Sequence, residues 1–308
     1  MAAIDVLIVT NDLGTSFDAL AHQMIAHLGD GIQARTLPWR RCSNEQCDVA
    51  VVLWWRPLCK GLVDPPAIRA RAVVGAVYDF HSWCHTPVLA ADFPDALARM
   101  DLLAVANADL LVALALQNYS LPPTFVCETG VDLETFRLRP PPARFSALWC
   151  GNSGAGENDL KGLGLVKAAC AQIGAPLLIA DSLGIEGPAI PYSQMPSWYE
   201  QGNVLVVGSS SEGTPRTALE AAASGRLVCG TRVGILPRLV QEGITGALAS
   251  ERTVASLADA LACCRNAARG WSTTSRACRR NAGQWDVRFK MLSWRHAIMV
   301  AHEMHHRG

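Results

Sequence analysis

Two carboxylates, Glu212 and Glu220, stand eight positions apart on either side of a turn and a helix start. An apolar run at 203–207 precedes them and predicts a buried strand, while 218–223 predicts a helix that ends at Gly225. The first carboxylate is therefore expected at the carboxyl end of a strand, and the second on the following helix. In open α/β sheets ligands bind at this edge, and a helix N-terminus offers N–H groups to an anion.

Strands and helices are expected to alternate on both sides of this pair. In the first half, the apolar runs predict strands at 4–10, 48–53, 73–78 and 110–114, and helices at 17–28 and 95–106. In the second half we expect strands at 146–150, 176–180, 203–207, 227–230 and 246–249, an extended piece at 189–191, and helices at 161–172, 195–199, 254–268 and 285–306. Such alternation predicts parallel, doubly wound sheets.

A break between two domains is expected at 138–143, where three consecutive prolines rule out a helix or a central strand. A chain of 308 residues favours two domains on length alone. We therefore predict an α/β protein with two tandem Rossmann-like domains, one over 1–140 and the other over 141–284, followed by a helix at 285–308.

Composition excludes several classes of protein. Half of the residues are hydrophobic and 18% are charged, which favours a compact core over disorder. Lys plus Arg and Asp plus Glu both number 27, so no overall charge attracts nucleic acid or anionic lipid. The N-terminus lacks a basic signal region, and no apolar run approaches the roughly 18 residues of a spanning helix. Eleven scattered cysteines indicate a reduced compartment without a metal site, so we expect a cytoplasmic protein without stable membrane insertion.

An ordered series of motifs surrounds the carboxylate pair. In chain order they lie at 129–132 with Phe136, then at 161–163, 195–199, 212–220, 225–228, 230–234 and 242–246. The series resembles retaining glycosyltransferases of the GT-B fold, family 4, whose E-x7-E signature corresponds to Glu212 and Glu220. A lone E-x7-E is a weak signal, but the order and spacing hold over roughly the last 180 residues.

The resemblance implies a fold, a reaction and partners. The domain at 1–140 would bind the acceptor, the domain at 141–284 would bind a nucleotide-sugar, and the helix at 285–308 would cross back to the first domain. The protein would transfer a hexose from a UDP- or GDP-sugar to an acceptor hydroxyl with retention of anomeric configuration. No Asp-x-Asp occurs in the chain, so we expect neither metal nor cofactor. The acceptor stays open among a carbohydrate, a lipid-linked molecule, a small molecule and, with less support, a modified nucleic acid, and the oligomeric state is also open.

The resemblance also assigns roles to individual residues. Lys161 would stabilise the leaving diphosphate, and Glu212 and Glu220 would accept hydroxyls of the sugar and the ribose. His81, at the end of a predicted strand, would lie near the donor sugar. The remaining donor-binding candidates are Gly14, Gly151, Asn152, Tyr192, Gly213, Thr214, Pro215, Arg216 and Thr217. Taken singly, Lys161 and the two glutamates have an ordinary alternative as solvated side chains near a helix start.

Two loops depart from familiar patterns. The family usually has Gly-Arg where this chain has Gly151 and Asn152, so Lys161, helped by Arg216, would supply the charge of the phosphate clamp. The missing arginine favours an alternative, a catalytically weak or inactive nucleotide-sugar-binding protein of the same fold. The loop at 11–16 has a single glycine, Gly14, and therefore lacks the dinucleotide fingerprint of nicotinamide enzymes.

The sequence leaves open a second enzyme class and adds three candidate residues for the acceptor side. A phosphorylase or an epimerase of the same fold is the other enzyme class considered, although no motif for a pyridoxal lysine is found. Three tryptophans are candidates for the acceptor side because they lie near predicted strand ends, where an indole ring could stack on a sugar. They are Trp54, Trp55 and Trp83.

Overall fold

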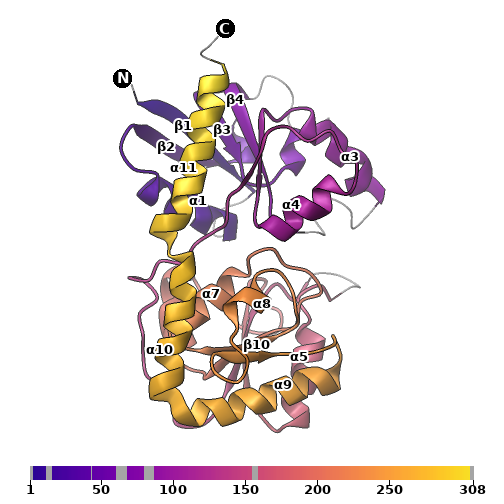
Figure 1. Cartoon of the computed structure of the whole chain (residues 1–308), viewed down its shortest axis with the longest axis vertical. Coiled ribbons are helices and arrows are strands. Elements are labelled where there is room, and N and C mark those ends of the chain that lie inside the picture. Colours follow the sequence, from indigo (N-terminus) through magenta and orange to yellow (C-terminus); the bar gives the residue numbers. More distant parts are fainter. Residues whose placement is uncertain are drawn as a thin grey trace. The chain divides into compact units, whose positions relative to one another are not determined.

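The chain divides into two compact units in a computed structural model that describes residues 3–11, 16–42, 44–59, 68–79, 87–154 and 159–305. One unit comprises Met1–Thr129 with Val287–Gly308, and the other comprises Gly130–Asp286. Each has one parallel sheet with helices packed on it (Figure 1). Among the described residues, no helix combines the length and the apolarity that crossing a membrane requires.

The first unit contains a six-stranded parallel sheet in the order β2-β1-β3-β4-β5-β6. Its strands are β1 (Ile4–Thr10), β2 (Ile32–Pro38), β3 (Glu45–Val52), β4 (Ile68–Val77), β5 (Leu102–Val105) and β6 (Thr124–Val126). Its helices are α1 (Ser16–His27), α3 (Pro87–Leu97), α4 (Ala108–Ala115) and α11 (Val287–Met304), with short 3-10 turns at Trp39–Arg41 and Arg56–Leu58.

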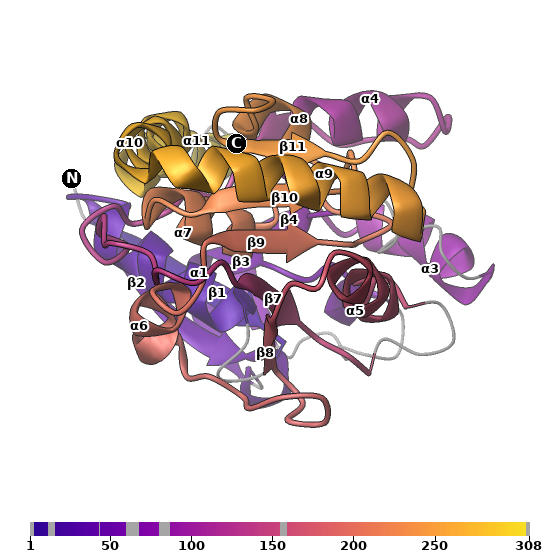
Figure 2. The ribbon, with the colours of Figure 1, turned by 90° about the horizontal axis from the view of Figure 1, so that it is seen from below.

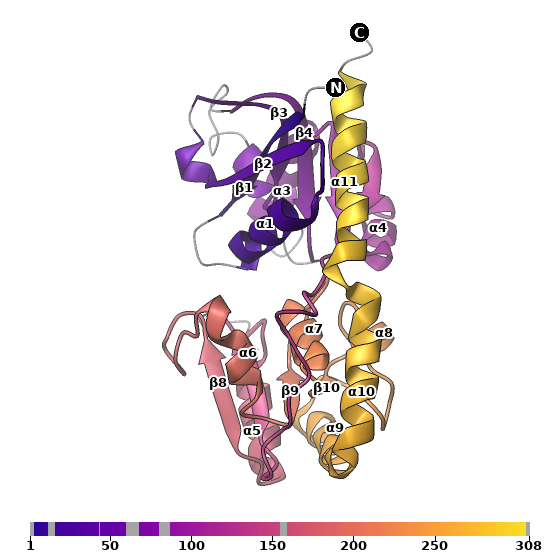
Figure 3. The same cartoon turned by 90° about the vertical axis from the view of Figure 1, so that its left-hand side faces the viewer.

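Alternate residues of each strand serve opposite faces of this sheet, as strand geometry requires. Ile8 on β1 joins a core cluster with residues of α1 and α11, and its neighbour Leu7 joins a second cluster with residues of α3 and α4. The long helix α11 lies along the strands and buries Trp294 and Ile298 against them (Figure 3). The last helix therefore completes the core of the first unit, although it is the last segment of the sequence.

The second unit contains a five-stranded parallel sheet in the order β11-β10-β9-β7-β8 (Figure 2). Its strands are β7 (Ala147–Gly151), β8 (Leu177–Asp181), β9 (Val204–Val207), β10 (Leu227–Gly230) and β11 (Gly246–Leu248). Its helices are α5 (Leu163–Gln172), α6 (Met195–Tyr199), α7 (Arg216–Ala223), α8 (Leu236–Leu239), α9 (Val254–Ala267) and α10 (Trp271–Ala282), with 3-10 turns at Tyr192–Gln194, Ala268–Gly270 and Gly283–Trp285.

The order of these strands reverses at β7. The chain leaves β7 to form β8 on one side and then returns to form β9 on the other. The loops that follow β7 and β9 therefore diverge at the carboxyl edge of the sheet. Such a switch point is where open α/β sheets bind ligands. The predicted fold class, two Rossmann-like parallel-sheet domains with a C-terminal helix on the first, is confirmed.

Two predicted elements of the first unit are wrong. The apolar run at 110–114 belongs to helix α4 and is not a strand, while the strand of this region, β5, lies inside the expected helix at 95–106. Asn107 explains the change, because its Oδ1 accepts a hydrogen bond of 2.8 Å from the N–H of Leu110 and caps α4. A short apolar run does not by itself distinguish a strand from a buried helix. In the second unit, the piece expected to be extended at 189–191 contains neither a helix nor a strand.

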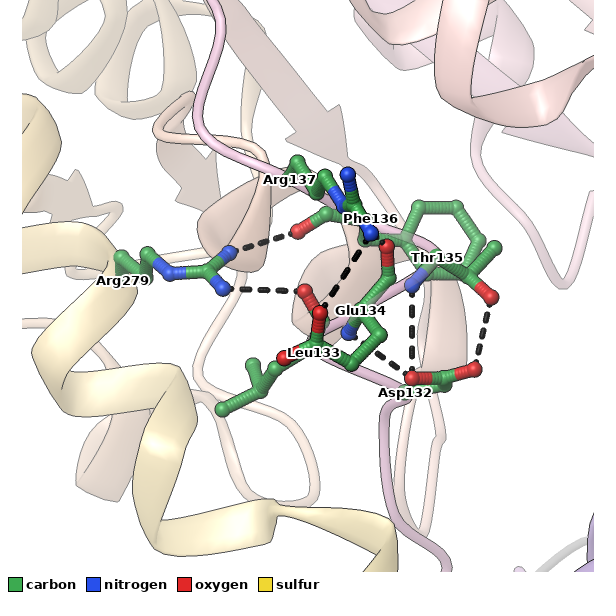
Figure 4. A network of polar contacts seen from close by, with 7 residues as sticks. All are labelled: Asp132, Leu133, Glu134, Thr135, Phe136, Arg137 and Arg279. Atoms are coloured by element: carbon green, nitrogen blue, oxygen red, sulfur yellow. Dashed lines mark hydrogen bonds and ion pairs between the residues drawn. The ribbon is translucent and has the colours of Figure 1, made fainter.

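The boundary between the units differs from the predicted one, because residues 130–140 lie in the second unit. The N–H of Val131 donates to the carbonyl of Trp285 at 2.8 Å. The guanidinium of Arg279 on α10 donates to the carbonyls of Leu133 and Phe136, at 2.9 and 2.7 Å (Figure 4). The three prolines therefore lie inside the second unit, where their stiffness shapes a loop and does not separate two bodies.

Candidate active site

The candidate site lies in the second unit, where two loops meet at the carboxyl edge of the sheet. One loop follows β7 and leads through Lys161 into α5, and the other follows β9 and leads through Glu212 into α7. The ammonium Nζ of Lys161 lies 2.6 Å from Oε1 of Glu212. The hydroxyl of Ser209 donates to the same oxygen at 2.7 Å. The structure thus brings together Lys161 and Glu212, to which the family resemblance assigns the leaving group and the donor sugar.

Both side chains of this ion pair are partly open to solvent. The Lys161 side chain is 38% exposed and the Glu212 side chain is 14% exposed. A half-exposed ion pair contributes little to stability, since solvent screens it. Its chemical value is different, because it holds a cation and a hydrogen-bond acceptor side by side where a ligand can reach both.

Two glycines allow the loops to approach so closely. Gly162 has φ +67°, and a Cβ at this position would lie 2.1 Å from the carbonyl oxygen of Gly208. The N–H of Ser210 donates to the carbonyl of Leu160 at 2.9 Å, which joins the two loops directly. The indole Nε1 of Trp149 donates to the carbonyl of Lys161 at 3.2 Å. Contact between backbones therefore sets the separation of Lys161 and Glu212.

The turn between the carboxylates is also fixed by a close backbone contact. A Cβ on Gly234, which has φ +51°, would lie 2.2 Å from the carbonyl oxygen of Gly213, and the N–H of Ile235 donates to that oxygen at 3.1 Å. Pro215, with φ −65° and ψ 97°, is the extended residue directly before α7, which begins at Arg216. The first turn of α7, with Arg216 and Thr217, follows at the same edge of the sheet. The N–H groups of a first helical turn can bind an anion.

Glu220 lies in a very different setting, inside a buried cluster. It is 4% exposed, and its Oε2 accepts a hydrogen bond of 2.9 Å from the hydroxyl of Tyr199. Its Oε1 lies 3.8 Å from Nη2 of Arg216. Arg216 also donates to the hydroxyl of Tyr192 at 3.1 Å and lies over the Tyr192 ring. The ribose candidate therefore already has protein partners on both oxygens.

The titration of this cluster follows from its burial. Burial raises the pKa of Glu220 above its ordinary value, while Arg216 and the hydroxyls of Tyr199 and Tyr192 act in the opposite direction. Burial and the neighbouring Glu220 raise the pKa of Tyr199 well above its ordinary value. Tyr199 thus remains a protonated donor, and Glu220 remains the acceptor of its hydrogen bond.

The loop after β7 carries Asn152 at the position where the sequence resemblance leads one to expect an arginine. Asn152 is exposed, and its Oδ1 accepts from the N–H of Gly154 at 2.9 Å. Buried Asp181, the last residue of β8, accepts from the N–H and the hydroxyl of Ser153. Burial alone would raise the pKa of Asp181, but hydrogen bonds from Ser153 and from loop N–H groups hold it well below its ordinary range. Asn152 thus takes part in local loop structure and brings no positive charge.

Sequence reasoning missed three polar residues of this region. Asp181 directly follows the predicted strand at 176–180, and Ser209 stands two residues after the predicted strand at 203–207, which is a signal that could have identified them. Tyr199 was recognised only as part of a helix motif. Its contact with Glu220 joins residues 21 positions apart and has no mark in the sequence.

Four of the predicted residues are not part of this site as the structure describes it. Gly14, His81 and Trp83 lie outside the described residues. Trp55 is 1% exposed and packs edge-on against Phe93 in the core of the first unit, so its candidacy for the acceptor side is wrong. Within the described parts of the chain, no group of three or more His, Cys, Asp or Glu side chains is arranged to hold a metal ion.

Sequence comparison adds relatives to this geometry. Residues 177–266 match the family "Glycosyl transferases group 1". The D-inositol 3-phosphate glycosyltransferase of Frankia alni is 32% identical over 215 residues, which are 63% of this chain and 47% of that protein. The enzyme of the same name from Mycobacterium avium is 36% identical over 131 residues, which are 39% of this chain and 31% of that protein. The matched part of the chain thus spans less than half the length of these relatives.

Solved structures resemble both units. HepE of Anabaena, in complex with UDP and glucose, has a TM-score of 0.74 at 15% identity and covers 96% of this chain and 100% of its own. Sucrose-phosphate synthase of Thermosynechococcus elongatus has a TM-score of 0.73 at 15% identity and covers 94% and 97%. Fold and sequence together define the class of the protein. The chain is a GT-B protein related to the group 1 glycosyltransferases, and the resemblance inferred from its motifs is confirmed.

Proposed function

We propose that the protein transfers a hexose from a nucleotide-diphospho-sugar to an acceptor hydroxyl. The observation that carries this proposal is the contact of 2.6 Å between Lys161 and Glu212 at the switch point of the second sheet. It supplies a cation for a leaving diphosphate and, beside it, a carboxylate that accepts sugar hydroxyls. The related sequences and the UDP complex of a similar fold support the use of a nucleotide-sugar donor.

The proposed reaction breaks the bond between the anomeric carbon and the diphosphate. Negative charge grows on the leaving oxygen, and Lys161 and the first-turn N–H groups of α7 oppose it. Glu212 orients the sugar through its hydroxyls, while Ser209 and Lys161 keep the Glu212 carboxylate in one position. The departing phosphate oxygen accepts the proton of the acceptor hydroxyl. Bond formation on the same face of the sugar gives retention.

We further propose that this transfer requires no metal ion. The sequence has no Asp-x-Asp, and Lys161 and Arg216 are cations at the carboxyl edge of the second sheet. Their charge, together with the dipole of α7, takes the place of a divalent cation on the diphosphate. Full turnover after exhaustive treatment with EDTA is the expected result. Turnover that disappears with EDTA and returns with Mg²⁺ or Mn²⁺ would contradict this part of the proposal.

The first experiment is a thermal-shift screen against UDP, GDP, ADP, dTDP and their hexose conjugates. A ligand that binds only the folded state raises the melting temperature. UDP- and GDP-sugars are the expected donors, and UDP and UDP-glucose are screened first. The selected donor is then incubated with a panel of hydroxyl acceptors, and the anomeric configuration of the product is determined by NMR. An inverted product would exclude the retaining reaction.

A second candidate is a nucleotide-sugar-binding protein with weak or no catalysis. The uncharged, exposed Asn152 favours it, because the loop after β7 adds no positive charge to a phosphate site. Tight donor binding without transfer or hydrolysis would support this candidate. The variant Asn152→Arg sharpens the choice, since it would restore the missing charge and raise turnover only if the remaining catalytic groups are competent.

A further inference from the structure

Arg252 connects the two loops that carry Lys161 and Glu212, although it lies far from both in sequence. Its Nε donates to the carbonyl of Gly208 at 3.0 Å, and its Nη2 donates to the carbonyl of Asp159 at 2.9 Å. Gly208 opens the loop after β9, and Asp159 stands two residues before Lys161. One planar guanidinium therefore joins the end of the loop before α5 to the start of the loop after β9.

The backbone at Asp159 shows why such a support is needed. Asp159 has φ +36°, a left-handed conformation that is unfavourable for a residue with a side chain. Its carboxylate accepts from the N–H groups of Leu163 and Gly164 at 3.0 and 3.1 Å and so caps α5. Its carbonyl is the group that Arg252 binds. The conformation that presents Lys161 is thus held from two sides, by the helix start and by the arginine.

We infer that Arg252 is a positioning residue for Lys161. It fixes the Lys161 loop against the β9 loop through the carbonyls of Asp159 and Gly208, and thereby sets where the ammonium meets the leaving diphosphate. This inference rests on the proposed transferase function. Arg252 itself is assigned no contact with a substrate.

The chain offers a matched control at the other end of α9. Arg252 precedes the start of α9, and Arg265 lies in its last turn. Arg265 donates from Nη2 to the carbonyl of Ile173 at 2.6 Å, at the opposite end of α5 from Lys161. Both arginines thus join the ends of α9 to the ends of α5 through backbone carbonyls. Only Arg252 does so beside the candidate site.

The first test compares Arg252→Ala with Arg265→Ala. We expect Arg252→Ala to lower kcat about 10- to 100-fold with a much smaller change in KM, because a displacement of the order of 1 Å at a catalytic group costs about that much. Arg265→Ala should keep kcat within about twofold while shifting the melting temperature by a similar amount. Equal kcat values for the two variants would overturn the inference.

A double-mutant cycle separates positioning from general destabilisation. If Arg252 acts through Lys161, its substitution should cost little in a Lys161→Ala background, so the combined loss should be far smaller than the product of the single losses. The full multiplicative loss would overturn the inference. Arg252→Lys is the conservative variant, because one ammonium cannot bridge two carbonyls as a guanidinium does. Complete rescue of kcat by Arg252→Lys would also count against the bridge.

A readout that needs no activity keeps the two proposals distinct. The amide of Ser210 donates to Leu160 across the same pair of loops, at 2.9 Å. Its hydrogen exchange should accelerate in Arg252→Ala and stay unchanged in Arg265→Ala. Unchanged exchange at Ser210 would overturn the inference even if the enzyme is active. A wild-type protein without transfer activity would instead overturn the proposed function.

Discussion

Glu212 and Glu220 stand on one turn and one helix, but the fold gives them opposite surroundings. Glu212 lies at the edge of the sheet beside a half-exposed lysine and a serine hydroxyl. Glu220 is buried beneath Tyr199 and Arg216. Two identical side chains, eight positions apart, thus become an accessible acceptor in one place and part of a packed polar cluster in the other.

The difference teaches what each carboxylate can do when a ligand arrives. A sugar hydroxyl at Glu212 meets a carboxylate that Lys161 and Ser209 hold in place and that is partly exposed to solvent. A ribose hydroxyl at Glu220 has to share or displace the hydroxyl of Tyr199 or the guanidinium of Arg216. Substitutions at the first position should therefore act on turnover, and substitutions at the second should act on stability and donor binding.

The largest effect is expected for Glu212→Ala. Loss of the carboxylate removes the orientation of the donor sugar and should lower kcat/KM by about 10³-fold or more. The melting temperature should change little, because the ion pair is partly exposed. Steady-state kinetics with the screened donor and a thermal melt are the measurements. Glu186→Ala is the control, because Oε2 of Glu186 lies 2.6 Å from Nζ of Lys167 in an ion pair on the exposed surface. The kcat/KM of this variant should equal that of the wild type.

Lys161→Ala should lower kcat by about 10²–10³-fold, the usual cost of removing one group that stabilises charge in a transition state. The Kd for the donor should rise much less, because the interaction strengthens as the leaving group becomes charged. Kinetics and calorimetric titration separate the two quantities. Lys167→Ala removes a lysine from the same unit and should leave both unchanged. An unchanged kcat with a weakened Kd would show that Lys161 only binds the ground state.

Gly162→Ala should disturb the contact between the two loops that carry Lys161 and Glu212, although it changes no polar side chain. The new methyl group would clash with the carbonyl of Gly208 in a left-handed conformation, so we expect a loss of about 2–4 kcal/mol in unfolding free energy. Gly174→Ala, at the other end of α5, has a similar φ of +64° but nothing within 4 Å of the added carbon. It should cost only about 1 kcal/mol. Urea denaturation of both variants gives the difference, and equal losses would contradict the close packing of the loops.

Glu220→Gln keeps an oxygen that can accept from Tyr199, so it should produce the smallest effect, a change in how stability depends on pH. Burial raises the pKa of Glu220 in the folded state above the ordinary carboxyl value of 4.5. At pH values just above 4.5, the folded protein therefore keeps a proton on Glu220 that the unfolded chain has lost. The wild type therefore loses stability as pH rises from that value through the raised pKa. The Gln variant has no such proton to lose, and its stability relative to the wild type should increase over the same window. Denaturation curves at pH 5 and pH 8 provide the measurement, and parallel pH profiles would contradict the assignment.

The contrast between the two carboxylates also separates what could be predicted from what could not. The strand before Glu212, the turn and the helix that carries Glu220 were all identified from apolar periodicity and from Gly225. The neighbours of the carboxylates were only partly foreseen. A helix pattern shows which positions share a face, but it does not show which side chain of another element lies opposite.

The errors in the first unit have a similar origin. The apolar run at 110–114 fits a buried strand and a buried helix equally well. Only the Asn107 cap and the neighbouring β5 decide between the two. The proline stretch suggested a boundary because prolines exclude regular structure. Contacts of Arg279 and Trp285 with residues 131–136 determine where the second unit actually begins.

By itself, the sequence determined the alternation of strands and helices in the second unit, the parallel character of both sheets and the identity of the residues that carry charge at the strand ends. These features follow from local periodicity and from the order of motifs. The tertiary structure alone decided that Lys161 meets Glu212, that Glu220 is buried with Tyr199, and that Arg252 joins two loops from a distance. The physical reason is that these contacts depend on strand order and on close backbone approaches, such as that of Gly162 to Gly208, which bring together residues without any fixed spacing in the chain.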